Sequence, residues 1–145
     1  MNAPRALLAS AALAVAIGAG CRTRSAPEPV KARFGVLFGG QIQERQEIPL
    51  ILDRSRLALV VRVEWAEPPE TAERVHWELA QPANPKDADA GSLVAYGDAR
   101  ARPGEPELDI PLAFRPGDKP GPWRVRVEVE GRPVLERPFR VVPAS

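Results

Sequence analysis

Few side chains in this 145-residue sequence could act as a nucleophile, a general base or a soft metal ligand, because the chain has one cysteine, Cys21, and one histidine, His76. Hydrolysis by a serine nucleophile needs an imidazole held between the serine and a carboxylate. His76 alternates with Val75 and Trp77, which places it on the polar side of a strand. A zinc site made of one histidine and carboxylates would be an unusual ligand set. We therefore expect a non-enzymatic protein without a catalytic site, a metal or a cofactor.

One acidic segment is spaced like the start of a calcium loop. It contains Asp87, Asp89 and Gly91. An EF-hand needs a third Asp or Asn where Gly91 stands, a glycine directly after it, and a bidentate glutamate later in the loop. The next glutamate is Glu105. The segment is therefore predicted to be a polar loop.

The N-terminal segment has the parts of a cleavable leader. Arg5 supplies a positive charge, and residues 6–17 carry no charge and only one polar side chain, Ser10. Twelve residues are too few to cross a hydrocarbon core of about 30 Å, so this stretch is typical of a signal peptide rather than a membrane span. Three small residues at positions 18–20 and then Cys21 follow.

The sequence Gly18-Ala19-Gly20-Cys21 resembles the lipobox of bacterial lipoproteins. That resemblance implies cleavage after Gly20 and attachment of a diacylglyceryl group to the thiol of Cys21, which would anchor the protein to a membrane without spanning it. The family prefers a leucine-like residue where Gly18 stands. The alternative is therefore ordinary cleavage near Gly20, which leaves a free thiol.

The resemblance also implies a location and a division of the chain. Arg22 follows the cysteine, and among Gram-negative lipoproteins the absence of Asp at that place implies sorting to the outer membrane, facing the periplasm. Residues 22–31 are polar with two prolines, as in an extended tether. We predict a signal peptide at 1–20, the lipidated cysteine and tether at 21–31, and one domain at 32–145.

The charge of that domain excludes one class of partner. Over residues 32–145 there are 16 Lys and Arg against 18 Asp and Glu. A nucleic-acid-binding domain carries a basic footprint. We therefore expect no nucleic-acid partner, and the remaining partners are the membrane and other envelope proteins.

The elements of the domain follow from apolar residues that recur at every second position, between clusters of Gly, Pro and Asp. The clearest runs are 57–65, 75–79, 108–114 and 123–129, and further candidates are 34–38, 48–52, 92–96 and 134–142. Helical spacing with caps is missing, and prolines interrupt the longer windows. This pattern predicts an all-β, antiparallel two-sheet sandwich of seven to eight strands, with a small barrel as the alternative.

The C-terminal stretch PGPWRVRVEVEGRPVLERPFRVV places Gly131 and Arg132 between two alternating runs, as in a hairpin. It resembles the last two strands of bacterial immunoglobulin-like domains, and Trp77 resembles the core tryptophan of that fold. The cysteine pair of antibody domains is absent. The resemblance implies an immunoglobulin-like sandwich and says little about function.

Two groups of residues could serve binding. Trp65, Trp77 and Trp123 are in phase with the apolar faces and are predicted to be core residues, but Trp65 stands just before a loop and could emerge there. Four arginines are predicted on the outward face of the last hairpin, where arginine would suit an acidic envelope partner: Arg124, Arg126, Arg137 and Arg140.

The function expected from these features is that of a membrane-anchored envelope lipoprotein acting as a binding or assembly module. Two other functions remain open. One is the binding of a sugar or another small ligand, and the other is that of an accessory hydrolase.

Overall fold

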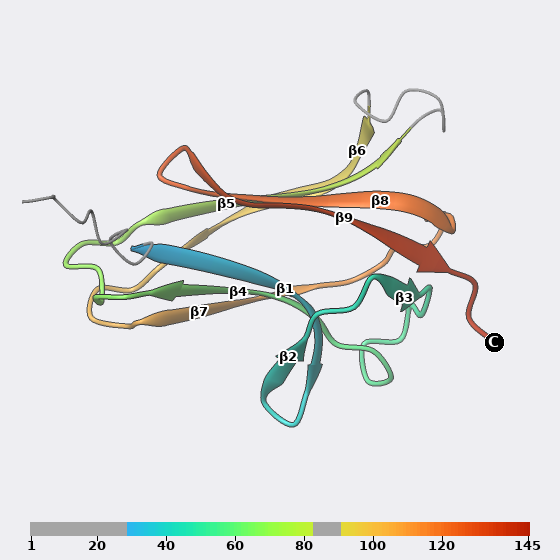
Figure 1. Ribbon diagram of the computed structural model, residues 1–145, viewed down its shortest axis with the longest axis horizontal. Coiled ribbons are helices and arrows are strands. Elements are labelled where there is room, and N and C mark those ends of the chain that lie inside the picture. The colour runs from blue at the N-terminus through green and yellow to red at the C-terminus, as the bar shows by residue number, and fades with distance from the viewer. Residues whose placement is uncertain (1–28, 83–90) are drawn as a thin grey trace, which may run out of the picture.

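The computed structural model describes residues 29–82 and 91–145, and these residues form an all-β structure. Their nine strands are β1 (Val30–Phe38), β2 (Gln41–Gln43), β3 (Glu47–Pro49), β4 (Leu59–Trp65), β5 (Arg74–Pro82), β6 (Gly91–Arg100), β7 (Glu107–Leu112), β8 (Gly121–Val129) and β9 (Arg132–Val142). A four-stranded sheet has the order β2-β1-β4-β7, and a five-stranded sheet has the order β3-β9-β8-β5-β6. The two sheets lie face to face (Figure 1), so the predicted sandwich is confirmed and the barrel is excluded.

The structure adds detail to the predicted strand pattern. It has nine strands, because the three-residue strand β2 is too short to show an alternation and was not predicted. The candidate run 48–52 overlaps β3, which covers Glu47–Pro49. Every pair of neighbouring strands is antiparallel except β3 and β9, which are parallel. Parallel pairing of these strands is possible because more than 80 residues of chain separate them, far more than the dozen that a crossover needs.

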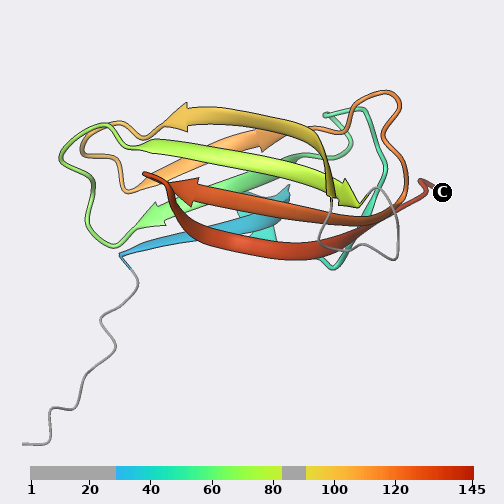
Figure 2. The ribbon, with the colours of Figure 1, turned by 90° about the horizontal axis from the view of Figure 1, so that it is seen from above.

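The first strand begins earlier than the tether boundary predicted at residue 31. Val30 and Lys31 already belong to β1, where Val30 pairs with Trp65 and Lys31 with Glu64. Val30 is half-buried and packs against the core. This pairing brings the start of the described chain to the end of the sandwich where β4 finishes (Figure 2).

The core lies between the sheets, and Trp123 is among its largest members, with an exposed fraction of 1%. The Trp123 ring meets the Phe114 ring edge-on at 5.5 Å between centroids and lies 6.2 Å from the ring of Phe139. Its indole Nε1 donates to the backbone oxygen of Lys119 at 2.9 Å, so the polar atom of this buried side chain is satisfied. The core position predicted for Trp123 is confirmed.

The predicted hairpin between β8 and β9 is present, with its turn one residue earlier than expected. Glu130 and Gly131 are the turn residues, with φ values of 49° and 75°. Two positive φ values in a two-residue turn match the right-handed twist of the flanking strands. The pairing register then shifts between Val127 and Glu128, which leaves Val134 as an extra residue in β9.

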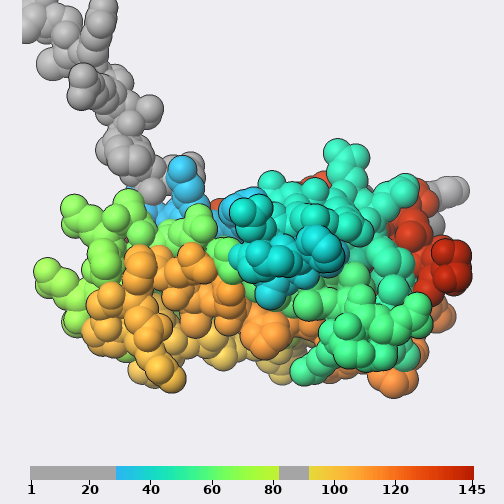
Figure 3. Space-filling view, turned by 90° about the horizontal axis from the view of Figure 1, so that it is seen from below, coloured from blue at the N-terminus to red at the C-terminus, as the bar shows by residue number. Residues whose placement is uncertain are grey.

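Loops gather at the two ends of the sandwich. Seen from below, the cyan-to-green segment that contains β2 and β3 spreads over one end of the molecule (Figure 3). The β4–β5 loop (light green) and the β6–β7 loop (orange) gather at the other end. Binding residues of sandwich proteins are commonly carried by such end loops.

Candidate functional site: a cleft at the tether end

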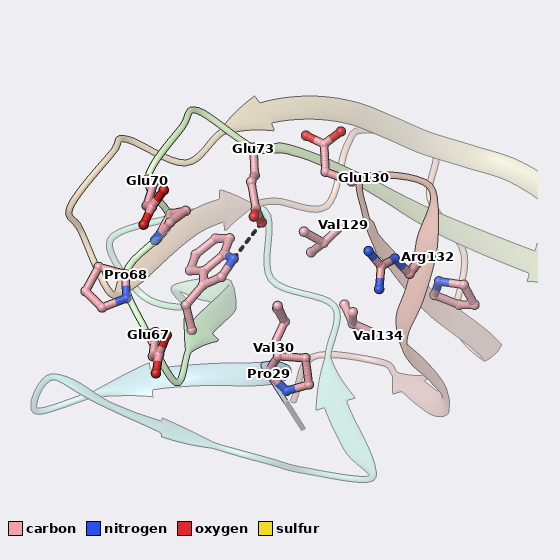
Figure 4. Close-up of a pocket in the computed structure, with 13 residues that line it drawn as sticks. Pro29, Val30, Glu67, Pro68, Glu70, Glu73, Val129, Glu130, Arg132 and Val134 are labelled. Atoms are coloured by element: carbon pink, nitrogen blue, oxygen red, sulfur yellow. Dashed lines mark hydrogen bonds between the residues drawn. The ribbon is translucent and has the colours of Figure 1, made fainter. Parts of the chain in front are cut away.

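A cleft of about 610 Å³ opens at the end of the sandwich where the chain enters β1. It is formed by the start of β1, the β4–β5 loop, the end of β8 and the start of β9 (Figure 4). We call it the tether-end cleft and define it by its lining residues, 29–30, 65, 67–70, 73, 129–130 and 132–134. Segments this distant in sequence meet only because the sheets stack.

Trp65 contributes the largest side chain of the cleft. It is the last residue of β4, and its exposed fraction is 6%. Its backbone N–H donates to the oxygen of Pro106 at 2.8 Å, and its indole Nε1 donates to Oε2 of Glu73 at 2.7 Å (Figure 4, dashed line). Trp65 therefore lines the cleft as the sequence suggested, but with its ring held in place and mostly covered.

Prolines make the walls stiff and apolar. Pro68 and Pro69 lie on the β4–β5 side, and Pro29 and Pro133 lie at the starts of β1 and β9. The Pro69 oxygen accepts a hydrogen bond from the Gly104 N–H at 2.9 Å, which ties the β4–β5 loop to the β6–β7 loop. Because proline fixes φ, little further conformational entropy is lost when such a wall closes on a ligand.

The rim of the cleft is acidic. Glu67 and Glu70 are exposed, and neither carboxylate has an ion pair within residues 29–82 and 91–145. The side chain of Glu130 accepts a hydrogen bond from the backbone N–H of Arg74. Together with Glu73, four carboxylates line the cleft against one guanidinium, that of Arg132.

The four arginines predicted on one hairpin face do not all lie there. Arg137 is opposite Val125, a residue of the buried face, and points toward the other sheet. Its Nη2 donates to the backbone oxygens of Phe34 at 3.0 Å and Arg45 at 3.2 Å, and its guanidinium carbon lies 5.6 Å from the centre of the Phe34 ring. The outward position predicted for Arg137 is wrong, because residues 137 and 140 are an odd number apart and a regular strand turns them to opposite faces.

The other three arginines lie on the outer face of the five-stranded sheet. Arg124 is 3.4 Å from a carboxylate oxygen of Glu136, and Arg126 is 2.6 Å from one of Glu128. Arg140 is exposed and opposite Pro122. Arg124 and Arg126 thus form ion pairs with carboxylates. A partner-binding role for the three arginines stays a prediction.

A second hollow, of about 700 Å³, lies between β9 and the segment before β3, and both Arg137 and Arg140 line it. Arg45 lines it with them, beside the carboxylates of Glu44 and Glu47. The sequence did not indicate Arg45, because nothing local predicts that residues 44–47 lie beside β9. Only the pairing of β3 with β9 brings Arg45 to this hollow, and the sequence pattern does not reveal that pairing.

His76 lies on the outer face of β5 as predicted, between two carboxylates. Its Nδ1 is 2.9 Å from Asp98 and its Nε2 is 3.1 Å from Glu78. The hydrogen bond to Asp98, followed by that to Glu78, raises the pKa of His76 above its ordinary value of 6.5. The hydrogen bond from Arg74, followed by that from His76, lowers the pKa of Asp98. The geometry is that of a small ion-pair network on a wet sheet face.

Some predicted features fall outside the part of the chain that the structure describes. Cys21 and the tether before Pro29 are among them, as are Asp87 and Asp89 of the predicted polar loop. Within the described residues there is no group of three or more His, Cys, Asp or Glu side chains placed to hold a metal ion. No helix long and apolar enough to cross a membrane occurs in those residues.

Comparison with known proteins shows the fold alone. No protein-family model and no curated protein matches the sequence. An immunoglobulin-like protein from Pseudomonas aeruginosa is similar in structure, with a TM-score of 0.53 and 21% identity over 78% of this chain and 96% of that chain. The immunoglobulin-like fold is therefore confirmed.

Weaker structural likeness extends to domains of larger enzymes. A β-glucosidase from Listeria innocua has a TM-score of 0.44 and 14% identity, over 77% of this chain and 16% of that chain. An alkylpurine DNA glycosylase from Pseudomonas fluorescens has a TM-score of 0.44 and 17% identity, over 80% of this chain and 31% of that chain. This chain spans less than a third of either enzyme.

Proposed function

We propose that this chain is a bacterial envelope lipoprotein whose immunoglobulin-like domain is a non-enzymatic binding or assembly module. In this proposal, the lipid on Cys21 anchors the protein to the outer membrane on its periplasmic side. The leader at residues 1–20, with small residues before a single cysteine, supports the anchor. The domain engages another envelope protein.

The observation that carries the binding role is the tether-end cleft. Ligand sites in proteins are typically concave, with a volume of about 300–1,000 Å³, apolar walls and a few placed polar groups. The cleft has about 610 Å³, a tryptophan and four prolines in its walls, and charged groups at its rim. Glu67, Glu70 and Arg132 are charged there without an ion pair among the described residues, which leaves them available to a ligand.

Binding of a sugar remains the alternative, because tryptophan rings stack on sugar rings. The exposed fraction of Trp65 is only 6%, and its Nε1 is already bonded to Glu73. A sugar would have to displace the covering side chains before its ring could reach the indole face. This cost favours a protein partner over a sugar.

The anchor can be tested by expressing the full chain with its leader in a Gram-negative host. The wild type should partition with the membranes and carry a lipid mass on Cys21, whereas Cys21→Ser should be soluble or remain unprocessed. Recovery of the wild type as a soluble protein with a free thiol would refute the anchor.

The binding role can be tested in the native envelope by site-specific cross-linking. A photoreactive residue in place of Pro68, at the cleft, should give a discrete adduct with another envelope protein. The matched control carries the same residue in place of Arg54, an exposed position in the β3–β4 loop at the other end of the sandwich (Figure 1). Equal labelling from both positions, or none from position 68, would contradict a binding module that uses this cleft.

A further inference from the structure

We infer that the tether-end cleft binds a basic side chain, lysine or arginine, presented by an extended segment of the partner. This inference rests on the proposed function and names the chemistry of its ligand. It follows from three properties of the cleft: the sign of its charge, the position of the unpaired carboxylates, and the apolar character of its walls.

The charge of the cleft selects a cation. Four glutamates line it against Arg132 alone, a formal balance of −3. Glu67 and Glu70 make no ion pair within residues 29–82 and 91–145, so the domain itself leaves these charges uncompensated. Complementary charge steers encounter and rejects partners of the wrong sign. A phosphate or an acidic peptide would meet repulsion on this side of the cleft.

Glu73 supplies a carboxylate whose position is already set. Its Oε2 accepts the hydrogen bond from Nε1 of Trp65 at 2.7 Å, and its Oε1 has no hydrogen bond within the described part of the chain. Trp65 is anchored by its own backbone hydrogen bond at the end of β4. A cation that binds Oε1 therefore meets a preorganised acceptor, and less side-chain entropy is lost on binding.

The walls suit the aliphatic part of a basic side chain. Lysine and arginine bury their methylene stems along apolar surface while the charged head stays among polar groups. In the tether-end cleft, Pro68, Pro133 and Val134 offer that surface. A small inorganic cation would leave these apolar walls without contacts.

Arg132 determines where the charged group of the ligand lies in the cleft. Its side chain comes from the start of β9, on the opposite side of the cleft from the β4–β5 loop (Figure 4). A bound cation is repelled from Arg132 and is directed to Glu67, Glu70 and Glu73. Removing the Arg132 charge should therefore strengthen binding.

The test measures fluorescence anisotropy of the labelled peptide Ac-Gly-Ala-Lys-Ala-Lys-Gly with the full chain, purified in a non-ionic detergent at low ionic strength. The same peptide with both lysines acetylated keeps the stems and removes the charge. We expect the lysine peptide to bind and the acetylated peptide to bind at least about 10-fold more weakly, because the charge-assisted contacts are lost. Equal affinity of the two peptides would overturn the inference.

Variants of the protein locate the binding. Glu67→Gln/Glu70→Gln should weaken binding of the lysine peptide about 5-fold, whereas Glu44→Gln/Glu47→Gln, with the same charge change at the far end, should change it by less than about 2-fold. Arg132→Gln should tighten binding about 2-fold to 3-fold. Equal weakening by both double variants would show attraction to the overall charge and would overturn the cleft as the site.

The combination of cross-linking and peptide binding separates this inference from the proposed function. If cross-links form at position 68 while the lysine peptide fails to bind, the binding module stands and the ligand chemistry is wrong. If neither is observed, both fail. Peptide binding that appears only with Arg22→Ser/Arg24→Ser would mean that the chain's own tether occupies the cleft, which would overturn an external partner as the occupant.

Discussion

Gly97 of β6 lies directly against the indole ring of Trp77 on the neighbouring strand. A Cβ atom at position 97 would be 2.8 Å from Cζ2 and 2.9 Å from Nε1 of that ring, closer than real contacts allow. The two residues are paired in the β5–β6 register, and the indole ring occupies the space that a side chain at position 97 would need. A residue without a Cβ at position 97 is what lets Trp77 pack against the edge of the core.

Gly97→Ala should therefore destabilise the domain, because either the ring or strand β6 must move. Overpacking of this kind typically costs about 1–3 kcal/mol. Equilibrium denaturation should show this loss in the wild-type background and a smaller one in a Trp77→Ala background, where the clash is absent. Equal costs in the two backgrounds would mean that the strand, rather than the ring, resists the methyl group.

Trp123→Ala should be the more damaging change, because it empties the centre of the core. Removal of a buried tryptophan typically costs about 3–5 kcal/mol, and Trp123 packs against Phe114 and Phe139 with an exposed fraction of 1%. The midpoint of chemical denaturation should fall accordingly. A midpoint close to that of the wild type would contradict the core packing described above.

Arg137 should matter for stability through its two hydrogen bonds to backbone oxygens rather than through its charge. Arg137→Lys keeps the charge but loses the planar fork, and should cost about 1–2 kcal/mol of unfolding free energy. Arg140→Lys, on the exposed face of the same strand, is the control and should stay within about 0.5 kcal/mol of the wild type. Similar losses in both variants would argue against the bridge from Arg137 to Phe34 and Arg45.

The pKa of His76 should be measurable without ambiguity, because this is the chain's one histidine. Its pKa is raised above 6.5 by the hydrogen bonds to Asp98 and Glu78. A raised folded-state pKa means that protonation favours the folded state. This stabilisation is fully present below pH 6.5 and is lost as the pH rises through the folded-state value.

An NMR titration of the His76 imidazole in wild type and Asp98→Asn checks this relation. Asp98→Asn removes the largest cause of the shift, so the pKa of His76 should move down toward its ordinary value. The pH dependence of unfolding near neutrality should flatten in the same variant. An unchanged imidazole pKa would show that Asp98 does not pair with His76 in solution.

The predicted partner role of the outer-face arginines can be tested apart from the cleft. We expect Arg124→Glu/Arg126→Glu to recover less of an acidic envelope partner than the wild type in pull-downs at moderate salt, provided both proteins melt alike. A reversed charge repels an acidic surface that arginine would attract. Equal recovery would place the docking surface elsewhere on the domain.

The sequence by itself determined the class of fold and the main strands. The alternation in residues 57–65 and 123–129 is local, and a strand with one buried face must place Val61 and Val125 inward wherever it pairs. The Glu130-Gly131 turn was predicted to within one residue for the same reason, since its chemistry is local. The separation of Arg137 from the other arginines also follows from the sequence. Arg137 and the apolar Phe139 are two residues apart, so they lie on the same face of the strand, and Phe139 is buried.

Only the tertiary structure decided what the distant segments do together. The parallel pairing of β3 with β9 brings Arg45 beside Arg137, and the stacking of the sheets joins residues near 30, 65 and 130 into the tether-end cleft. The hydrogen bond between Trp65 and Glu73 depends on how the β4–β5 loop closes over the end of the core. Alternation specifies which face of a strand is buried, but it carries no information about which strand or loop covers that face, because the hydrophobic contacts that decide this are non-directional.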